Sequence, residues 1–205
     1  ENGGRVSCKR NSDGSESPYE LNITYVDAFL NKKSGFDEYH SNRFLASQAI
    51  QFVLPGVPAT YIHSILGSHN WEQGVRQTQM ARSINREKLR LDDIIKQLED
   101  PDSFRSRIFF QYIGLIKIRK KQPAFHPNAF FEILELDPKV FAILRHCKEQ
   151  IIYTLTNISS THVSVSLPKD KGDSDMKDLL SGKIFKANSI GLNPYQFVWL
   201  VTRNR

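Results

Sequence analysis

The stretch that decides the fold runs from Gly56 to Arg86 and reads GVPATYIHSILGSHNWEQGVRQTQMARSINR. Within it, Ala59 to His63 predicts a short buried strand, and Ile65 to Arg90 predicts a long polar loop. The loop carries Trp71, Arg76, Arg82, Asn85 and Arg86. A strand that ends in such a loop is how a (β/α) barrel builds a ligand site at its C-terminal face. Arginine offers forked donors and tryptophan a flat face, so we expect this loop to favour polyhydroxylated or phosphorylated ligands.

Helical patterns lie on both sides of this stretch. Residues 37–54 predict a helix with one apolar stripe, which the pair Pro55-Gly56 ends. Residues 91–98 predict a second helix, and Asp102-Ser103 is a good N-cap for a third, which Pro123 ends. Residues 1–18 predict an irregular loop, and residues 19–30 fit either a strand or a helix.

After Pro123 the pattern changes from helical to alternating. The segments that predict strands are FFEILEL, VFAILRH, EQIIYTLTN, HVSVSLP and QFVWLV. Asp178 to Gly182 predicts a turn without chemistry, and Trp199 predicts a core residue. Short strands at this spacing are typical of an antiparallel β-sandwich. We therefore expect α/β material over residues 1–124, the C-terminal part of a barrel with its last strand and helices, and a β-sandwich domain over residues 125–205.

The composition narrows the class of protein. The net charge is +6 over 205 residues, but the basic residues are scattered, and the one tight run, Arg119 to Lys121, ends a predicted helix. With no zinc spacing and no aromatic–basic pattern, nucleic-acid binding and a metal site are not expected. No apolar run reaches a membrane-spanning length. Two cysteines far apart, Cys8 and Cys147, indicate a reducing compartment, so we expect a cytoplasmic protein. The polar start without Met suggests a piece of a longer chain.

Three motifs together resemble a known family. SPYELNITYVDAF, QFVLPGVPATYIHSILGS and RSINR, with DLLSG in the β domain, resemble the sucrose-phosphorylase branch of the α-amylase superfamily (glycoside hydrolase family 13). That branch includes phosphorylases of sucrose, sucrose phosphate, glucosylglycerol and glucosylglycerate. The resemblance implies a (β/α)8 barrel followed by a β-sandwich, and this chain matches the C-terminal portion only.

The resemblance also implies a reaction and its partners. The family's catalytic carboxylates lie upstream of such a segment, and no His-Asp pair occurs here, so no catalytic residue is assigned to this chain. Glu16 and Glu20 are acidic candidates by residue type alone, since a retaining enzyme needs two carboxyl groups about 5 Å apart. The implied parent transfers glucose from a small-molecule α-glucoside to phosphate, with no cofactor beyond inorganic phosphate as co-substrate. The implied partners are the remainder of the barrel, or a second chain, and a homodimer, since relatives can be dimers.

The resemblance assigns substrate-binding roles to Tyr19, Glu20 and Arg82. Tyr19 and Glu20 fall in the segment that resembles the acceptor loop, and Arg82 matches a donor-site arginine that would hold glucosyl hydroxyls. Sucrose phosphorylases tend to have Asp-Leu-Tyr-Gln where this chain has residues 17–20, Ser-Pro-Tyr-Glu, which favours another acceptor. Ser83 stands where some members have Asp. His63 and His69 are expected to be satisfied polar residues.

Several functions stay open at this point. The parent could be a phosphorylase or a hydrolase of the same superfamily that uses water. The chain could instead be a non-catalytic carbohydrate-binding or assembly module. Because the catalytic carboxylates are missing, the chain alone is expected to be inactive in either enzyme. Which acceptor is used, fructose, fructose phosphate, glycerol or glycerate, does not follow from the sequence.

Overall fold

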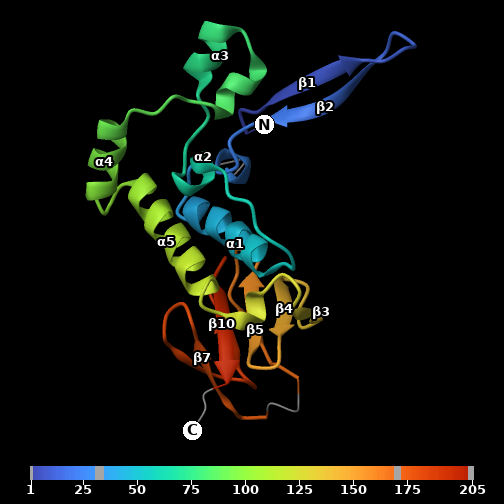
Figure 1. Cartoon of the computed structure of the whole chain (residues 1–205), viewed down its shortest axis with the longest axis vertical. Helices are drawn as coiled ribbons and strands as arrows, with labels where there is room; N and C mark the ends of the chain where they lie inside the picture. Colours follow the sequence, from blue (N-terminus) through green and yellow to red (C-terminus); the bar gives the residue numbers. More distant parts are fainter. Residues whose placement is uncertain (1, 31–34, 169–171, 203–205) are drawn as a thin grey trace. The chain divides into compact units, whose positions relative to one another are not determined.

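The structure is a computed structural model that describes residues 2–30, 35–168 and 172–202 (Figure 1). The chain divides into two compact units. The first contains residues up to 44 and residues 60–110, and the second contains residues 45–59 and residues from 111 onward. The division passes through helices α1 (His40–Val53) and α5 (Phe104–Arg119). The predicted boundary near residue 125 stays a prediction.

A β-hairpin opens the first unit. Strands β1 (Arg5–Arg10) and β2 (Glu16–Asn22) pair antiparallel, so the loop predicted over residues 1–18 is wrong, and part of residues 19–30 is a strand. The short helix η1 (Asp27–Phe29) follows. Ser7 pairs with Glu20 but Cys8 pairs with Pro18, so Tyr19 is an extra residue, a β-bulge. Most hairpin side chains are exposed, which is why burial periodicity left no strand signal.

The stretch from Ala59 to Arg90 differs from its prediction. Residues 59–61 belong to no helix or strand, and residues 62–65 form helix α2 (Ile62–Ile65), so the buried strand predicted at Ala59–His63 is wrong. A strand needs a neighbour for its backbone groups, and among the described residues no segment pairs with this one. The predicted loop holds two more helical segments, α3 (Glu72–Thr78) and η2 (Ala81–Asn85). The Trp71 ring lies over Gly74, where an added Cβ would meet it at 2.0 Å, so this tryptophan packs on its own helix.

The predicted helices are confirmed. α1 and α5 occupy the two long predicted segments, and α4 (Leu91–Glu99) occupies the short one between them. The predicted N-cap of α5 is also present, because the Ser103 hydroxyl accepts the backbone N–H of Ser106 at 3.0 Å. In the second unit, α1 and α5 meet through Tyr112, whose hydroxyl donates to Gln48 and whose ring lies edge-on to Phe52. No helix in the described ranges is long and apolar enough to span a membrane.

The second unit contains a β-sandwich after the short helix η3 (Pro123–Phe125). Its described strands are β3 (Phe130–Ile133), β4 (Val140–His146), β5 (Ile151–Asn157), β6 (Val163–Val165), β7 (Asp175–Asp178), β8 (Ile184–Lys186), β9 (Ile190–Leu192) and β10 (Phe197–Thr202). Six form an antiparallel sheet in the order β3-β4-β5-β10-β7-β8, and β6 pairs with β9. The five predicted strands are confirmed, and β7, β8 and β9 are additional.

The central strands of the large sheet, β5 and β10, are mostly buried. One face packs against β6 and β9 through a cluster that includes Leu155, Leu192 and Leu200. The other face buries Trp199, whose ring lies 4.9 Å from that of Phe125. Every residue of β5 after Ile151 is buried, which fits a central strand between two covered faces. The predicted core position of Trp199 is confirmed.

Two arginines join this sheet to the end of α1. Arg145 on β4 is fully buried and donates to the backbone carbonyls of Val53 and His126 at 2.8 and 2.9 Å. Arg119 on α5 donates to the carbonyls of Phe52, Gly56 and Phe125. The last carbonyls of a helix lack partners within it and carry its negative dipole end, so these cations cap α1. Burial, followed by repulsion from Arg119, lowers the pKa of Arg145.

The segment Asp178 to Gly182 is the turn between β7 and β8, as predicted. Asp178 is buried, and its carboxylate accepts four bonds: from the backbone N–H groups of Leu180, Ser181 and Trp199, and from the Ser181 hydroxyl. One side chain therefore fixes the turn and ties it to the central strand β10.

Candidate functional site

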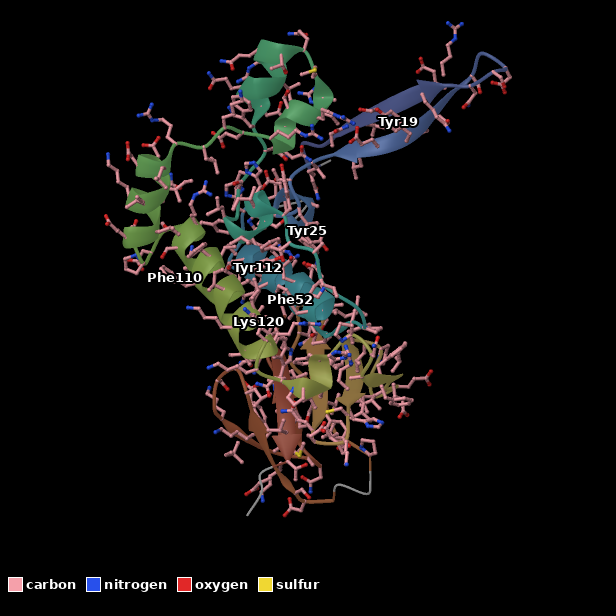
Figure 2. The ribbon with its side chains drawn as sticks, viewed as in Figure 1. Tyr19, Tyr25, Phe52, Phe110, Tyr112 and Lys120 are labelled. Atoms are coloured by element: carbon pink, nitrogen blue, oxygen red, sulfur yellow. The ribbon has the colours of Figure 1, made fainter. Side chains whose placement is uncertain are left out.

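The structure brings together the three residues assigned to substrate binding. One Arg82 nitrogen, Nη2, donates to both carboxylate oxygens of Glu20, at 3.1 Å to Oε1 and 2.9 Å to Oε2. The hydrogen bond and charge of Glu20, with smaller contributions from Tyr19, raise the pKa of Arg82. Figure 2 shows Tyr19 on β2, where its side chain is 58% exposed. Residues 62 positions apart in sequence therefore form one exposed group.

The β-bulge explains how two neighbouring residues of β2, Tyr19 and Glu20, can both lie near Arg82. Neighbouring side chains on a regular strand point to opposite faces, so Tyr19 and Glu20 would be separated. Tyr19 is the extra residue of the bulge, and a bulge interrupts the regular alternation of side chains along a strand. Bulges often serve this purpose next to functional sites.

The chemistry available here is binding, without covalent catalysis. Arg82 keeps further N–H donors, Glu20 keeps acceptor lone pairs, and a Tyr hydroxyl can do both. Such groups suit the hydroxyls of a sugar. The other acidic candidate, Glu16, lies toward the hairpin tip opposite Arg10 and is exposed, so it does not form a carboxylate pair with Glu20.

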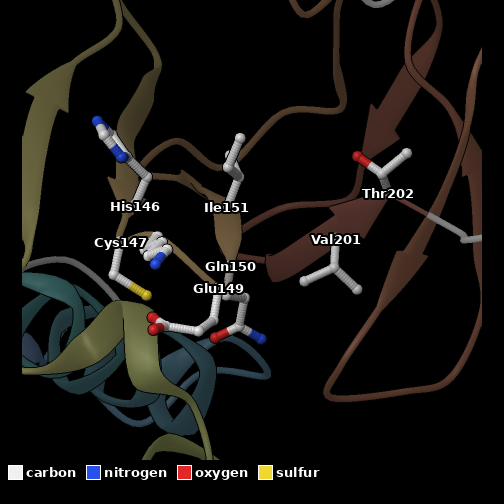
Figure 3. Close-up of a pocket in the computed structure, with 8 residues that line it drawn as sticks. His146, Cys147, Glu149, Gln150, Ile151, Val201 and Thr202 are labelled. Carbon is white, nitrogen blue, oxygen red and sulfur yellow. The ribbon is translucent and has the colours of Figure 1, made fainter.

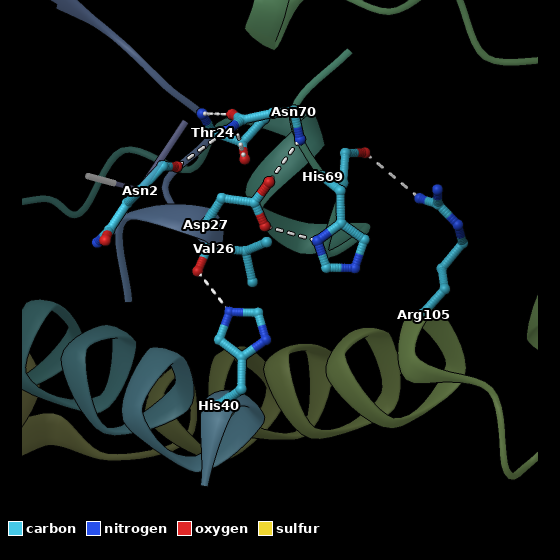
Figure 4. Close-up of polar contacts among 9 residues, drawn as sticks. Asn2, Thr24, Val26, Asp27, His40, His69, Asn70 and Arg105 are labelled. Carbon is cyan, nitrogen blue, oxygen red and sulfur yellow. Dashed lines mark hydrogen bonds and ion pairs between the residues drawn. The ribbon is translucent and has the colours of Figure 1, made fainter. Parts of the chain in front are cut away.

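A polar network that sequence inspection missed lies in the same unit (Figure 4). Asp27 is buried, and its two oxygens meet His69 Nδ1 at 2.6 Å and the backbone N–H of Asn70 at 2.7 Å. The Asn70 side-chain oxygen accepts from the backbone N–H and the hydroxyl of Thr24. These partners lie more than 40 positions apart and share no motif, so no local signal marked them.

The structure also shows where the other polar residues of this unit lie. His63 belongs to α2 and meets the Ser68 hydroxyl at 3.0 Å, and His69 meets Asp27, so both histidines are satisfied as predicted. Asn85 is structural: its amide donates to the carbonyl of Ile23. Arg76 and Arg86 are exposed. His40 donates to the Val26 carbonyl and lies among the rings of Phe36, His69 and Phe104.

Two of these histidines should make stability depend on pH. Burial is the largest cause that lowers the pKa of both His40 and His63. With the folded pKa below the unfolded value of about 6.5, the unfolded chain takes up protons first as the pH falls. The contribution of these two neutral histidines to stability is then fully present above pH 6.5 and is lost as the pH falls below it. Melting temperature measured from pH 7.5 to 5 should fall, and His40→Gln should flatten the slope. The exposed His162, changed to Gln, serves as the control; an unchanged slope in His40→Gln would contradict this assignment.

A hollow among the described residues lies elsewhere, in the second unit. It has a volume of about 480 Å³ and is lined by the β4–β5 turn, His146 to Ile151, and by Val201 and Thr202 (Figure 3). None of the residues assigned to substrate binding lines it. The contacts around Arg82 are the better guide to function because they join chemically suited groups from different elements.

The fold is that of the C-terminal part of a (β/α) barrel followed by its β-sandwich domain. The Maltogenic Amylase, C-terminal domain model matches residues 131–199. The structure resembles sucrose 6F-phosphate phosphorylase from Thermoanaerobacter thermosaccharolyticum, with a TM-score of 0.64 and 20% identity, over 91% of this chain and 34% of that one. This likeness confirms the predicted fold class, although the strand at Ala59–His63 is absent.

The relatives found by sequence identify the branch of the α-amylase superfamily to which this chain belongs. The chain is 41% identical to a glucosylglycerate phosphorylase of Spirochaeta thermophila over 78% of its own length and 27% of the relative's. It is 36% identical to a glucosylglycerate phosphorylase of Escherichia coli over 97% of its own length and 35% of the relative's. The chain therefore spans about a third of these relatives. It belongs to the α-amylase superfamily, in the sucrose-phosphorylase branch, and corresponds to the C-terminal portion.

Proposed function

We propose that this chain is part of a retaining α-glucosyl phosphorylase that transfers glucose from an α-glucoside to inorganic phosphate. The observation that carries the proposal is the meeting of Tyr19, Glu20 and Arg82, residues that the family resemblance placed on the acceptor and donor sides of one site. The two carboxyl groups that such a double displacement needs are supplied outside this chain. The reaction requires no cofactor beyond phosphate.

The acceptor we favour is glycerate. Two relatives that cover most of this chain are glucosylglycerate phosphorylases, and residues 17–20 depart from the Asp-Leu-Tyr-Gln pattern of sucrose phosphorylases.

The proposed partner is the rest of the barrel. Tyr61 ends the unpaired segment, Ile62 begins α2, and the two residues are 49% and 54% exposed. Neighbouring barrel strands would cover these apolar side chains and pair with the backbone beside them. We further propose a cytoplasmic location, supported by the unpaired thiols of Cys8 and Cys147. A homodimer rests on the resemblance alone.

The test is a phosphorolysis assay on the longer protein that contains this chain. Offered sucrose, sucrose phosphate, glucosylglycerol and glucosylglycerate, it should release glucose 1-phosphate from glucosylglycerate, and residues 1–205 alone should release none. Arg82→Ala should lower kcat/KM about 10- to 100-fold, the value of a hydrogen bond to a charged group. The exposed Arg107, changed to Ala, is the matched control. Release of free glucose independent of phosphate would overturn the proposal in favour of a hydrolase.

A further inference from the structure

The two segments that form the proposed site come from different parts of the first unit. Tyr19 and Glu20 lie on β2, whereas Arg82 lies on η2, after α2 and α3. The direct link between them is the Arg82–Glu20 ion pair, whose side chains are 45% and 30% exposed. Exposed ion pairs contribute little to holding a geometry. A ligand that uses either group must also share or break this pair.

Partly buried contacts join the same two segments a few residues away. Just beyond β2, Thr24 is 4% exposed, and its backbone N–H donates to the Asn70 side-chain oxygen at 2.8 Å. The Thr24 hydroxyl donates to the same oxygen at 3.1 Å. Asn70 precedes Trp71, the residue that begins α3. This side chain therefore attaches the end of β2 to the start of the α3–η2 segment.

Asp27 makes the second attachment. Its Oδ2 accepts the backbone N–H of Asn70, and its Oδ1 meets His69, so the carboxylate holds two consecutive residues of the loop (Figure 4). With 4% of its surface exposed, Asp27 is held away from water, where hydrogen bonds of a charged group are strong. The carboxylate thus orients the backbone from which the Asn70 side chain projects.

Two further hydrogen bonds attach η2 to these same segments. The backbone N–H of Trp71 donates to the Ile84 carbonyl at 2.7 Å, and the Asn85 amide donates to the Ile23 carbonyl at 3.4 Å. The end of β2 is therefore connected to η2 in two ways: through Thr24 and Asn70, and through the Arg82–Glu20 pair. The Arg82–Glu20 contact is exposed to solvent, whereas Thr24 and Asp27 are buried.

We propose that Asn70 and Asp27 are positioning residues that set Arg82 against the Tyr19–Glu20 segment. The inference rests on the proposed function, in which these groups bind the donor and the acceptor of one transfer. When a ligand occupies the hydrogen-bonding groups of Arg82 and Glu20, the contacts of Asn70 with Thr24 and Asp27 hold the two segments in place. Displacements of about 1 Å in such a site can cost up to 100-fold in rate.

The test replaces Asn70 by alanine in the longer protein that contains this chain. The Ser106→Ala variant is the control, since it removes a buried hydroxyl bond to the Leu98 carbonyl in the same unit. At a temperature where both variants are folded, Asn70→Ala should lower kcat for glucosylglycerate phosphorolysis about tenfold, and Ser106→Ala should not. Should Asn70→Ala fail to fold, Thr24→Val removes only the bond from the Thr24 hydroxyl to Asn70 and should lower kcat by a smaller factor.

Hydrogen exchange supplies a readout that does not need activity. Loss of the Asn70 side chain should increase amide exchange together at residues 19–25 and at residues 80–86, while Ser106→Ala leaves both segments unchanged. Equal kcat in the two variants, or faster exchange in only one of these segments, would overturn the inference. A wild-type protein that releases no glucose 1-phosphate would instead overturn the proposed function, and the exchange result would then decide the positioning role by itself.

Discussion

Replacing Arg145 by alanine should lower the free energy of unfolding of the second unit by about 3–5 kcal/mol, the range of a large buried truncation. The guanidinium is fully buried and holds the carbonyls of Val53 and His126. Removing it leaves the buried Val53 carbonyl without its donor, at a cost of roughly 1–3 kcal/mol, removes the bond to the His126 carbonyl as well, and opens a cavity. Urea unfolding followed by far-ultraviolet circular dichroism measures the change.

Two variants decide the cause of that loss. Arg145→Lys keeps the charge but not the planar fork, so it should recover only part of the stability. Lys177→Ala removes an exposed cation from β7 and should change stability by less than about 0.5 kcal/mol. If Arg145→Ala were no more destabilising than Lys177→Ala, capping of α1 by Arg145 would be energetically irrelevant.

Replacing Asp178 by alanine should cost the sandwich about 3 kcal/mol, since it leaves buried donors unpaired. The carboxylate serves Leu180, Ser181 and Trp199, and the Trp199 N–H belongs to a central strand where no water can replace the lost acceptor. The β7–β8 turn should loosen along with β10. Thermal unfolding measures the loss, and hydrogen exchange locates it.

Asp137→Ala is the matched control for Asp178. Asp137 also accepts the N–H two residues later in a turn, from Lys139 at 2.7 Å, but it is half-buried and ties no second strand. Its loss should cost less than about 1 kcal/mol. Asp178→Asn should fall between the two, because an amide offers one acceptor oxygen where the carboxylate offers two. Equal losses in Asp178→Ala and Asp137→Ala would refute the special role of the β10 bond.

Elements with a local pattern could be predicted from the sequence. α1, α5 and β4 carry apolar spacing that their own residues determine, and β4 coincides with the predicted VFAILRH. β7, β8 and β9 were missed because they are three or four residues long and lie among Ser, Lys, Asp and Gly. The strand at Ala59–His63 failed for a different reason, since apolar composition does not provide a pairing partner.

The site was foreseeable only in part. Tyr19, Glu20 and Arg82 were selected by motif, and their contact depends on a bulge that the sequence does not signal. Asp27 and Asn70 act through contacts across more than 40 residues, so no spacing rule could point to them.

The bulge at Tyr19 also divides the hairpin into two parts that can evolve separately. Toward the base, Ser7 pairs with Glu20, and Asn22 donates to Ser7, so this part is tied to the site. Toward the tip, the turn bonds are internal, from Asn11 to Ser15. Inserting or deleting two residues in each strand beyond the bulge changes the reach of the tip by about 7 Å without altering which side chain meets Arg82. The length of the tip is therefore free to vary while the Arg82–Glu20 contact is kept.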